Sequence, residues 1–169
     1  PQPQPTVERT DLFAVKSAED IAYRIPSIAV TPTGRLIAVV DYRIVRSDIG
    51  VVNNGRIDLH YRTSDDNGHT WSDTKVLIEG KGAEATDFMS VGYGDPCIVA
   101  DRESDRVLVM SCAGNVSFQN GTRQRHQNIA LFYSEDGGQT WSAPEDIAES
   151  IYSQFDESSY GPVRSMFVA

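Results

Sequence analysis

The stretch SDDNGHTW, residues Ser64–Trp71, occurs a second time as SEDGGQTW, residues Ser134–Trp141. Both copies have the pattern Ser-x-Asp-x-Gly-x-Thr-Trp. Ser and Asp side chains can accept hydrogen bonds from backbone N–H groups inside a tight bend, glycine permits positive φ, and Trp can cover the turn from the core side. The motif therefore predicts the same hairpin turn at two places in the chain.

A second pair of positions shows that the repetition extends beyond this turn. Pro26 in IPSIAV and Pro96 in DPCIVA have the same offset as the two motifs. Between these anchors, Arg35–Val40 and Arg106–Ser111 occupy matching places, with one residue of slippage in the preceding turn. Two independent anchors that agree indicate a long internal repeat.

Each repeat contains four β-rich runs separated by turn signals, which predicts four antiparallel strands per unit. The predicted strands are Ile25–Thr31, Arg35–Tyr42, Ile57–Ser64 and Lys75–Glu79, then Cys97–Asp101, Arg106–Cys112, Gln127–Ser134 and Glu145–Ala148. The last run is ambiguous, because Ala and Glu are weak strand formers. An all-β chain of repeated four-stranded units is typical of propeller blades.

Composition excludes several classes of function. The chain has 169 residues, 40% of them hydrophobic, and a net charge of −9 with scattered Lys and Arg. We therefore expect no nucleic-acid partner, since a phosphate-binding groove needs clustered positive charge. No apolar run approaches the roughly 20 residues of a membrane-spanning helix. The opening PQPQPT predicts an extended linker, so residues 1–15 are interpreted as a domain boundary, and the missing initiator Met and signal segment indicate a mature or trimmed chain.

No metal or cofactor is expected. A calcium loop at Asp65–Gly68 is the alternative, but the glycine and the following Glu stand at the wrong offsets for one. Cys97 and Cys112 are too few for a disulfide-built scaffold and have no metal-ligand spacing with the three histidines. Two buried thiols are the simplest interpretation; a cross-strand disulfide over the Ser104–Asp105 turn is the alternative.

The combination of motifs resembles the sialidase (neuraminidase) family, in particular its secreted bacterial members. Tyr23-Arg24-Ile25-Pro26 resembles the Phe/Tyr-Arg-Ile-Pro motif of that family, and the repeated turn resembles its Asp box. An Asp box alone is weak, because it also occurs in non-enzymatic propellers. The resemblance covers roughly residues 20–145 and includes the stretch Gly55–Ser64.

This resemblance implies the N-terminal portion of a six-bladed catalytic propeller over residues 16–169. Blade 1 would span about 22–80, blade 2 about 93–150, and a third blade would start at about 161–169. Its partners would be sialylated glycans and the remainder of the propeller, and the protein would be secreted, periplasmic or on the cell surface. Two blades alone would leave sheet faces uncovered.

The resemblance also implies roles for three polar residues. Arg24 would be the first of three arginines that bind the carboxylate of the sugar, a group that a planar guanidinium can grip with two hydrogen bonds. Arg43 would be the next family arginine, beside the sugar's O4 and carboxylate. Asp95 would stand where Arg24 stands in the first unit and, as the partner of Arg43, accept from the O4 hydroxyl. The alternatives are a surface ion pair for Arg24 and a plain turn role for Asp95.

The long loop IVRSDIGVVNNG between Arg43 and the third strand contains the candidate acid. Asp48 matches the family's general acid/base, which protonates the leaving oxygen and later activates water. The neighbouring Ile and Val side chains would supply apolar cover that favours the protonated carboxyl. An Asp that only caps its own turn is the alternative. Asp41 is a rival acid whose strand-end position better suits support of an arginine.

The remaining site is only partly present in this sequence. In the family, an apolar pocket for the N-acetyl group lies where this chain has Val116 and Phe118. The nucleophile would be a Tyr polarised by a Glu, both supplied by later blades, because a carboxylate nucleophile would approach a carbon that already bears one. The leading hypothesis is a retaining exo-α-sialidase. A non-catalytic binding propeller and a transglycosylating relative are the alternatives.

Overall fold

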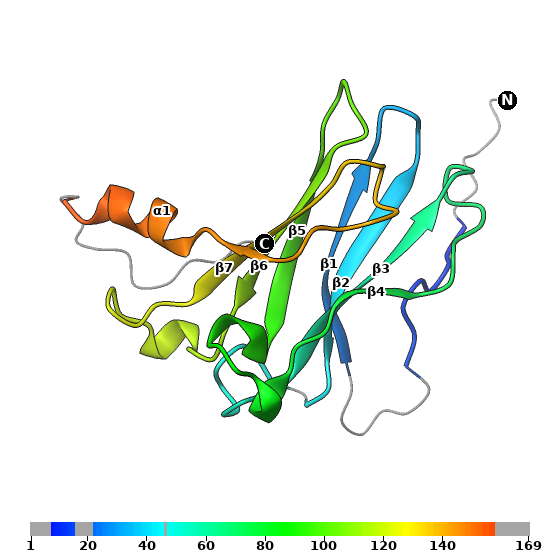
Figure 1. Ribbon diagram of the computed structural model, residues 1–169. Helices are drawn as coiled ribbons and strands as arrows, with labels where there is room; N and C mark the ends of the chain where they lie inside the picture. Colours follow the sequence, from blue (N-terminus) through cyan, green and yellow to red (C-terminus); the bar gives the residue numbers. More distant parts are fainter. Residues whose placement is uncertain (1–7, 16–21, 46, 158–169) are drawn as a thin grey trace, which may run out of the picture.

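Two four-stranded antiparallel sheets make up most of the computed structural model, which describes residues 8–15, 22–45 and 47–157 (Figure 1). The first sheet has the order β1 (Ala22–Val30), β2 (Leu36–Arg43), β3 (Ile57–Ser64) and β4 (Lys75–Ile78). The second has the order β5 (Tyr93–Ala100), β6 (Val107–Ala113), β7 (Asn128–Ser134) and β8 (Glu145–Asp146). The all-β class and the four strands per repeat are confirmed. The predicted start of a third unit, 161–169, lies outside the described residues.

Strands β1 and β5 begin earlier than predicted, because each continues across its proline. The register with the next strand shifts between Arg24 and Ser27 in β1, and between Gly94 and Cys97 in β5. Such a bulge tolerates a residue that has no N–H to donate to the ladder. The strands therefore extend on both sides of the proline instead of starting after it.

The positions of the two bulges show which residues of the two repeats correspond to each other. The residues before the prolines, Ile25 and Asp95, have φ of 50° and 51°, in the left-handed region that side-chain-bearing residues rarely adopt. Asp95 is thus the counterpart of Ile25, and Gly94 is the counterpart of Arg24. The expectation that Asp95 stands where Arg24 stands is off by one residue, and Asp95 lies inside a strand.

The repeated motif folds into the same turn twice. Ser64 Oγ accepts from the N–H of Gly68 at 2.9 Å, and Asp66 accepts from the N–H and hydroxyl of Thr70 at 2.8 and 2.6 Å. In the second turn, Ser134 Oγ accepts from the N–H of Gly138 at 2.8 Å, and Asp136 accepts from the N–H and hydroxyl of Thr140 at 2.9 and 2.6 Å. Both glycines have positive φ. Each turn joins the third strand of a sheet to its fourth.

The inner faces of the two sheets pack against each other and form the main core. Its buried side chains are Ile37, Val39, Leu59, Tyr61, Tyr93, Ile98, Val107, Val109, Ala113, Ala130 and Phe132. The outer face of the second sheet is not covered by the described chain: Val99, Leu108 and Tyr133 lie side by side in the register and are 55, 36 and 43% exposed. In the first sheet, Ile28 and Val30 of β1 are 57 and 58% exposed as well, so both sheets leave apolar side chains open to solvent.

The end of the second repeat differs from the prediction of a strand over 145–148. Strand β8 stops at Asp146, and the short helix α1 (Ala148–Tyr152) follows. Ala148 and Tyr152, four residues apart, bury against Ile129 of β7, and Ala is the best helix former. The remaining helices are single 3₁₀ turns: η1 (Gly82–Glu84), η2 (Met89–Val91), η3 (Phe118–Asn120) and η4 (Ser153–Phe155).

Part of the predicted linker lies on the first sheet. The rings of Phe13 and Tyr23 are 5.3 Å apart, and Arg62 donates to the carbonyl of Leu12 at 2.6 Å.

In the described part of the chain, no helix has the length and apolar composition to span a membrane.

The two cysteines are not joined by a disulfide. In the register Cys97 stands opposite Met110 and Cys112 stands opposite Gly94, so the β5 bulge lies between the two pairs. Cys112 is buried, as expected, while Cys97 is partly exposed. The alternative of a cross-strand disulfide is therefore wrong for this structure.

Candidate functional site

The predicted polar residues gather at one end of the two sheets. Arg24 lies near the start of β1, Arg43 is the last residue of β2, and Asp95 is near the start of β5. Because the strands run antiparallel, the start of one and the end of the next meet at the same edge. The loop of residues 44–56, which contains Asp48, joins β2 to β3 at this edge, the lower one in Figure 1.

Arg43 and Asp41 form the buried centre of this cluster. They are two residues apart on β2 and so point to the same face; they are 1% and 0% exposed. Arg43 Nε and Nη2 donate to Asp41 Oδ2 at 3.1 and 2.8 Å, and the same oxygen accepts from the Asp95 N–H at 3.2 Å. Asp41 thus supports the arginine, as its strand-end position predicted, and also binds the second sheet.

The guanidinium of Arg43 connects the two sheets and the loop. Its Nη2 donates to Asp95 Oδ1 at 3.0 Å, and its Nη1 donates to the carbonyl of Ser47 at 2.9 Å. Nη1 also lies 3.3 Å from Asp48 Oδ1. A guanidinium has five N–H donors, and these contacts direct all three of its nitrogens to groups of the chain. The geometry makes Arg43 an organiser of three carboxylates.

The cluster is electrostatically unbalanced. Burial raises the pKa of Asp41, although the hydrogen bond from Arg43 opposes this. Burial also raises the pKa of Asp95, and the charge of Asp48 raises it further. Burial alone would lower the pKa of Arg43, but the hydrogen bond and charges of its partners raise it overall. Three carboxylates share one buried guanidinium, so the cluster contains more acidic than basic groups.

Arg24 supplies positive charge at the rim of the cluster. It is exposed and stands opposite Asp41 in the β1–β2 register, directly before the bulge at Ile25. Its charge helps to lower the pKa of Asp95, against the larger effect of burial. The structure therefore brings Arg24 to the same edge as the buried carboxylates, with its side chain open to solvent.

Asp48 is the accessible carboxyl of the group. Its side chain is 47% exposed, compared with 0% for Asp41 and 8% for Asp95. Asp48 Oδ1 accepts from the N–H of Ile49 at 2.8 Å, so the local turn contact that was considered as an alternative is present too. Ile49 itself is 2% exposed and packs with Ile57 and Cys112, which anchors the loop. A ligand at this edge can reach Asp48 from solvent.

Val116 and Phe118 differ in their exposure to solvent. Val116 is 3% exposed and lines a cavity of about 190 Å³ together with polar side chains that include Asn53 and Asn115. Phe118, in η3, is 47% exposed and is not among the residues that line this cavity. Contact of both residues with an N-acetyl group stays a prediction.

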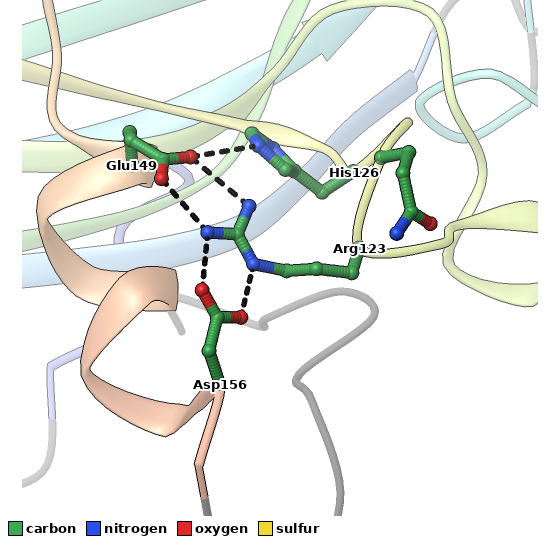
Figure 2. Close-up of a pocket in the computed structure, with 5 residues that line it drawn as sticks. Arg123, His126, Glu149 and Asp156 are labelled. Atoms are coloured by element: carbon green, nitrogen blue, oxygen red, sulfur yellow. Dashed lines mark hydrogen bonds and ion pairs between the residues drawn. The ribbon is translucent and has the colours of Figure 1, made fainter.

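A second charged cluster lies beside α1 (Figure 2). Arg123 donates to both oxygens of Glu149, at 2.8 and 3.0 Å, and to Asp156, and these hydrogen bonds raise its pKa. His126 lies next to the same Glu149 carboxylate, with Nε2 3.8 Å from it. Because both carboxylates are bound to Arg123, the cluster braces α1 against the loop after β6.

Sequence reasoning anticipated that Asp41 supports an arginine and that Asp95 is a partner of Arg43, but it missed the contacts of Arg43 with the Asp48 loop and the other contacts that hold this loop. The spacing of Asp41 and Arg43 on one strand face was a usable signal for their pairing, whereas the partner Asp95 comes from the other sheet.

Among residues 8–15, 22–45 and 47–157, no group of three or more His, Cys, Asp or Glu side chains is placed to hold a metal ion.

Comparisons with known proteins find sialidases among the relatives of this chain. No family model matches the chain. It is 32% identical over 152 residues to a sialidase of Micromonospora viridifaciens, which covers 84% of this chain and 22% of the relative. It is 30% identical over 139 residues to a sialidase of Bacteroides fragilis, covering 77% of this chain and 25% of the relative. The chain therefore spans about a quarter of the length of these curated relatives.

A solved structure of a Hadza microbial sialidase is similar as well. It has a TM-score of 0.58 and 28% sequence identity, and the match covers 75% of this chain and 26% of that chain. Similarity in sequence and similarity in fold thus each cover about three quarters or more of this chain.

Proposed function

This chain is related to the sialidases over most of its length, and we propose that it is the part of such an enzyme that carries the general acid/base and the first carboxylate-binding arginine. The complete protein would be an exo-α-sialidase that removes terminal sialic acids from glycoconjugates. The remaining blades of a six-bladed propeller would cover the open flank at Val99, Leu108 and Tyr133.

One observation carries this proposal. Asp48 is a half-exposed carboxyl held 3.3 Å from a buried arginine, at the sheet edge that also presents the exposed Arg24. A carboxyl that exchanges protons with a substrate must be accessible, and the two other carboxyls of the cluster are buried. Among the three, Asp48 alone meets this condition.

The proposed reaction uses the two exposed groups for different tasks. The guanidinium of Arg24 binds the sugar carboxylate with charge-assisted hydrogen bonds. The hydroxyl of a Tyr gives its proton to a Glu as the Tyr oxygen forms a bond to the anomeric carbon, and Asp48 gives its proton to the glycosidic oxygen as the bond between that oxygen and the anomeric carbon breaks. In the second step the ionised Asp48 takes a proton from water, the water oxygen forms a bond to the anomeric carbon, and the Tyr oxygen leaves and takes its proton back from the Glu. The Tyr, its Glu and two further arginines would come from sequence beyond the described residues.

The buried groups would set the position of the sugar. Arg43 and Asp95 are bonded to each other at 3.0 Å, and we assign this pair to the O4 hydroxyl, with Arg43 acting chiefly through the carboxylate that it holds. Additional arginines from other blades would also balance the excess of carboxylates in the cluster. Val116 and Phe118 remain candidates for contact with the N-acetyl group, from two separate positions.

Turnover of a fluorogenic sialoside by the complete protein tests the proposal. Asp48→Ala and Arg24→Ala should each lower kcat/KM by at least about 100-fold, the usual contribution of a positioned acid or a bidentate clamp. Asp73→Ala and Arg102→Ala are matched controls, because both residues are exposed and lie at the opposite end of the sheets. Near wild-type turnover in both site variants would overturn the assignment.

Two other results would identify the alternatives. Sialoside binding without turnover in the wild-type protein would indicate a binding propeller. Turnover that yields a transferred or anhydro sugar instead of free sialic acid would indicate a transglycosylating enzyme. Product analysis by mass spectrometry separates these outcomes.

A further inference from the structure

We propose that Asn115 is a positioning residue for Asp48: its side-chain amide holds the far end of the acid-bearing loop against the second sheet. The inference rests on the proposed function of Asp48, and it assigns a role to a residue outside the charged cluster. Asn115 comes from the segment that follows β6, whereas Asp48 belongs to the loop that follows β2.

One amide makes three contacts across the two sheets. Asn115 Oδ1 accepts from the backbone N–H of Asn54 at 3.1 Å. Asn115 Nδ2 donates to the side-chain oxygens of Asn53 and Asn54 at 3.1 and 3.0 Å. An amide supplies an acceptor and two donors, so both ends of this side chain are used. Asn54 has φ of 54°, a conformation that asparagine tolerates better than most residues.

The backbone of the loop at Gly50 also lies directly against the backbone of Val116 and Ser117, because glycine has no side chain to separate them. A Cβ added at Gly50, which has φ of 66°, would lie 2.3 Å from the Ser117 nitrogen and 2.4 Å from the Val116 carbonyl carbon. Val116 and Ser117 are both 3% exposed, so this support is itself packed in place. Residues 115–117 thus form the surface on which the loop rests.

Asp48 lies between two tethers. On one side, the Ser47 carbonyl is bonded to Arg43 at 2.9 Å. On the other, Asn53 and Asn54 are bonded to Asn115. The segment between these points has a buried Ile49 and the close contact at Gly50, so its freedom is small. A displacement of about 1 Å in a catalytic group can lower the rate about 100-fold; release of the second tether would therefore act on catalysis through Asp48.

The test compares two sialosides in the complete protein, one with a phenolic leaving group and one with a sugar hydroxyl. A phenolate leaves readily without a proton, whereas a sugar oxygen needs the acid. Asn115→Ala should lower kcat for the sugar leaving group between about 10- and 100-fold and for the phenol several-fold less. Asn120→Ala is the matched control, since it removes an exposed Asn from the same segment.

Two further measurements separate positioning from a general loss of structure. In an Asp48→Ala background, Asn115→Ala should leave the ratio of the two rates unchanged, because its effect passes through Asp48. Hydrogen exchange of peptides that cover 47–56 should be faster in Asn115→Ala than in wild type, with no change in β6 or β7.

The outcomes are distinct. An unchanged ratio in Asn115→Ala, with wild-type turnover intact, overturns the positioning role alone. An equal fall for both substrates also overturns it, because that result indicates a structural contribution. Absence of turnover in the wild-type protein overturns the proposed function, and the role of Asn115 with it.

Discussion

Replacement of Arg43 by Met is the sharpest test of how the cluster is held together. The variant keeps an unbranched apolar stem of similar shape and removes the guanidinium from between Asp41 and Asp95. Asp41 would retain one hydrogen bond, from the Asp95 N–H, and its Oδ1 is already buried without a partner among the described residues. Removal of one partner from a buried ion pair destabilises a protein by about 3–5 kcal/mol. We expect a loss of this size at pH 7.5.

The loss should depend on pH in a defined direction. Burial already raises the pKa of Asp41 and Asp95, and removal of Arg43 takes away a charge that opposes this rise. A carboxyl whose pKa is higher in the folded than in the unfolded state stabilises the fold when protonated, and this stabilisation disappears as pH rises through the folded pKa. The deficit of Arg43→Met relative to wild type should therefore shrink as pH falls from 7.5 to 5.

Urea titration of the complete protein at both pH values measures the effect. Arg102→Met is the control; its side chain is exposed in the β5–β6 turn, and we expect a change within about 0.5 kcal/mol. Asp41→Asn in the Arg43→Met background should recover part of the loss at pH 7.5, because it removes one uncompensated charge. A deficit below about 1 kcal/mol, or one that is the same at both pH values, would refute the reasoning.

Three further predictions concern the fold. Gly138→Ala should destabilise by about 1–3 kcal/mol more than Gly34→Ala, because both glycines have positive φ but only at Gly138 would a Cβ clash, 2.7 Å from Ile37 Cδ1; equal Tm shifts would contradict this. Hydrogen bonds from Thr70 lower the pKa of Asp66 to about 2. The ionised Asp66 carboxylate therefore stabilises the fold at pH values above its pKa in the unfolded chain, and this stabilisation is lost as pH falls toward 2. Asp66→Asn should lower the Tm at pH 7 and leave a smaller difference from wild type at pH 2.5. Burial lowers the pKa of His60, so the unfolded chain takes up its proton first and stability falls as pH drops below about 6.5; in His60→Gln the Tm should fall less between pH 7.5 and 5.5, and an unchanged slope would show that His60 does not contribute.

The sequence predicts the two sheets because the signals are local. Short β-rich runs bounded by turn signals define the strands, and a turn motif that satisfies its own backbone defines the third hairpin of each unit. The extension of β1 and β5 across Pro26 and Pro96 was missed, since a bulge depends on pairing with the neighbouring strand. The helix at Ala148 was missed for a similar reason: its burial against Ile129 decides between two weak propensities.

The site was predictable only where motif residues carry it. Arg24 and Asp48 were identified from the motifs around them, and the structure places both at one sheet edge. The hydrogen bonds from Arg43 to Asp95 and from Asn54 to Asn115 join residues from different repeats. Neither contact has a local sequence signature, because each depends on how the two repeats pack.

A crystal structure of the complete protein with bound sialic acid tests the central claim most directly. The account predicts that the sugar carboxylate is hydrogen-bonded to the Arg24 guanidinium, and that an Asp48 carboxyl oxygen lies within hydrogen-bonding distance of the oxygen on the anomeric carbon. A sugar bound elsewhere, or bound so that Arg24 and Asp48 cannot both touch it, would contradict the account.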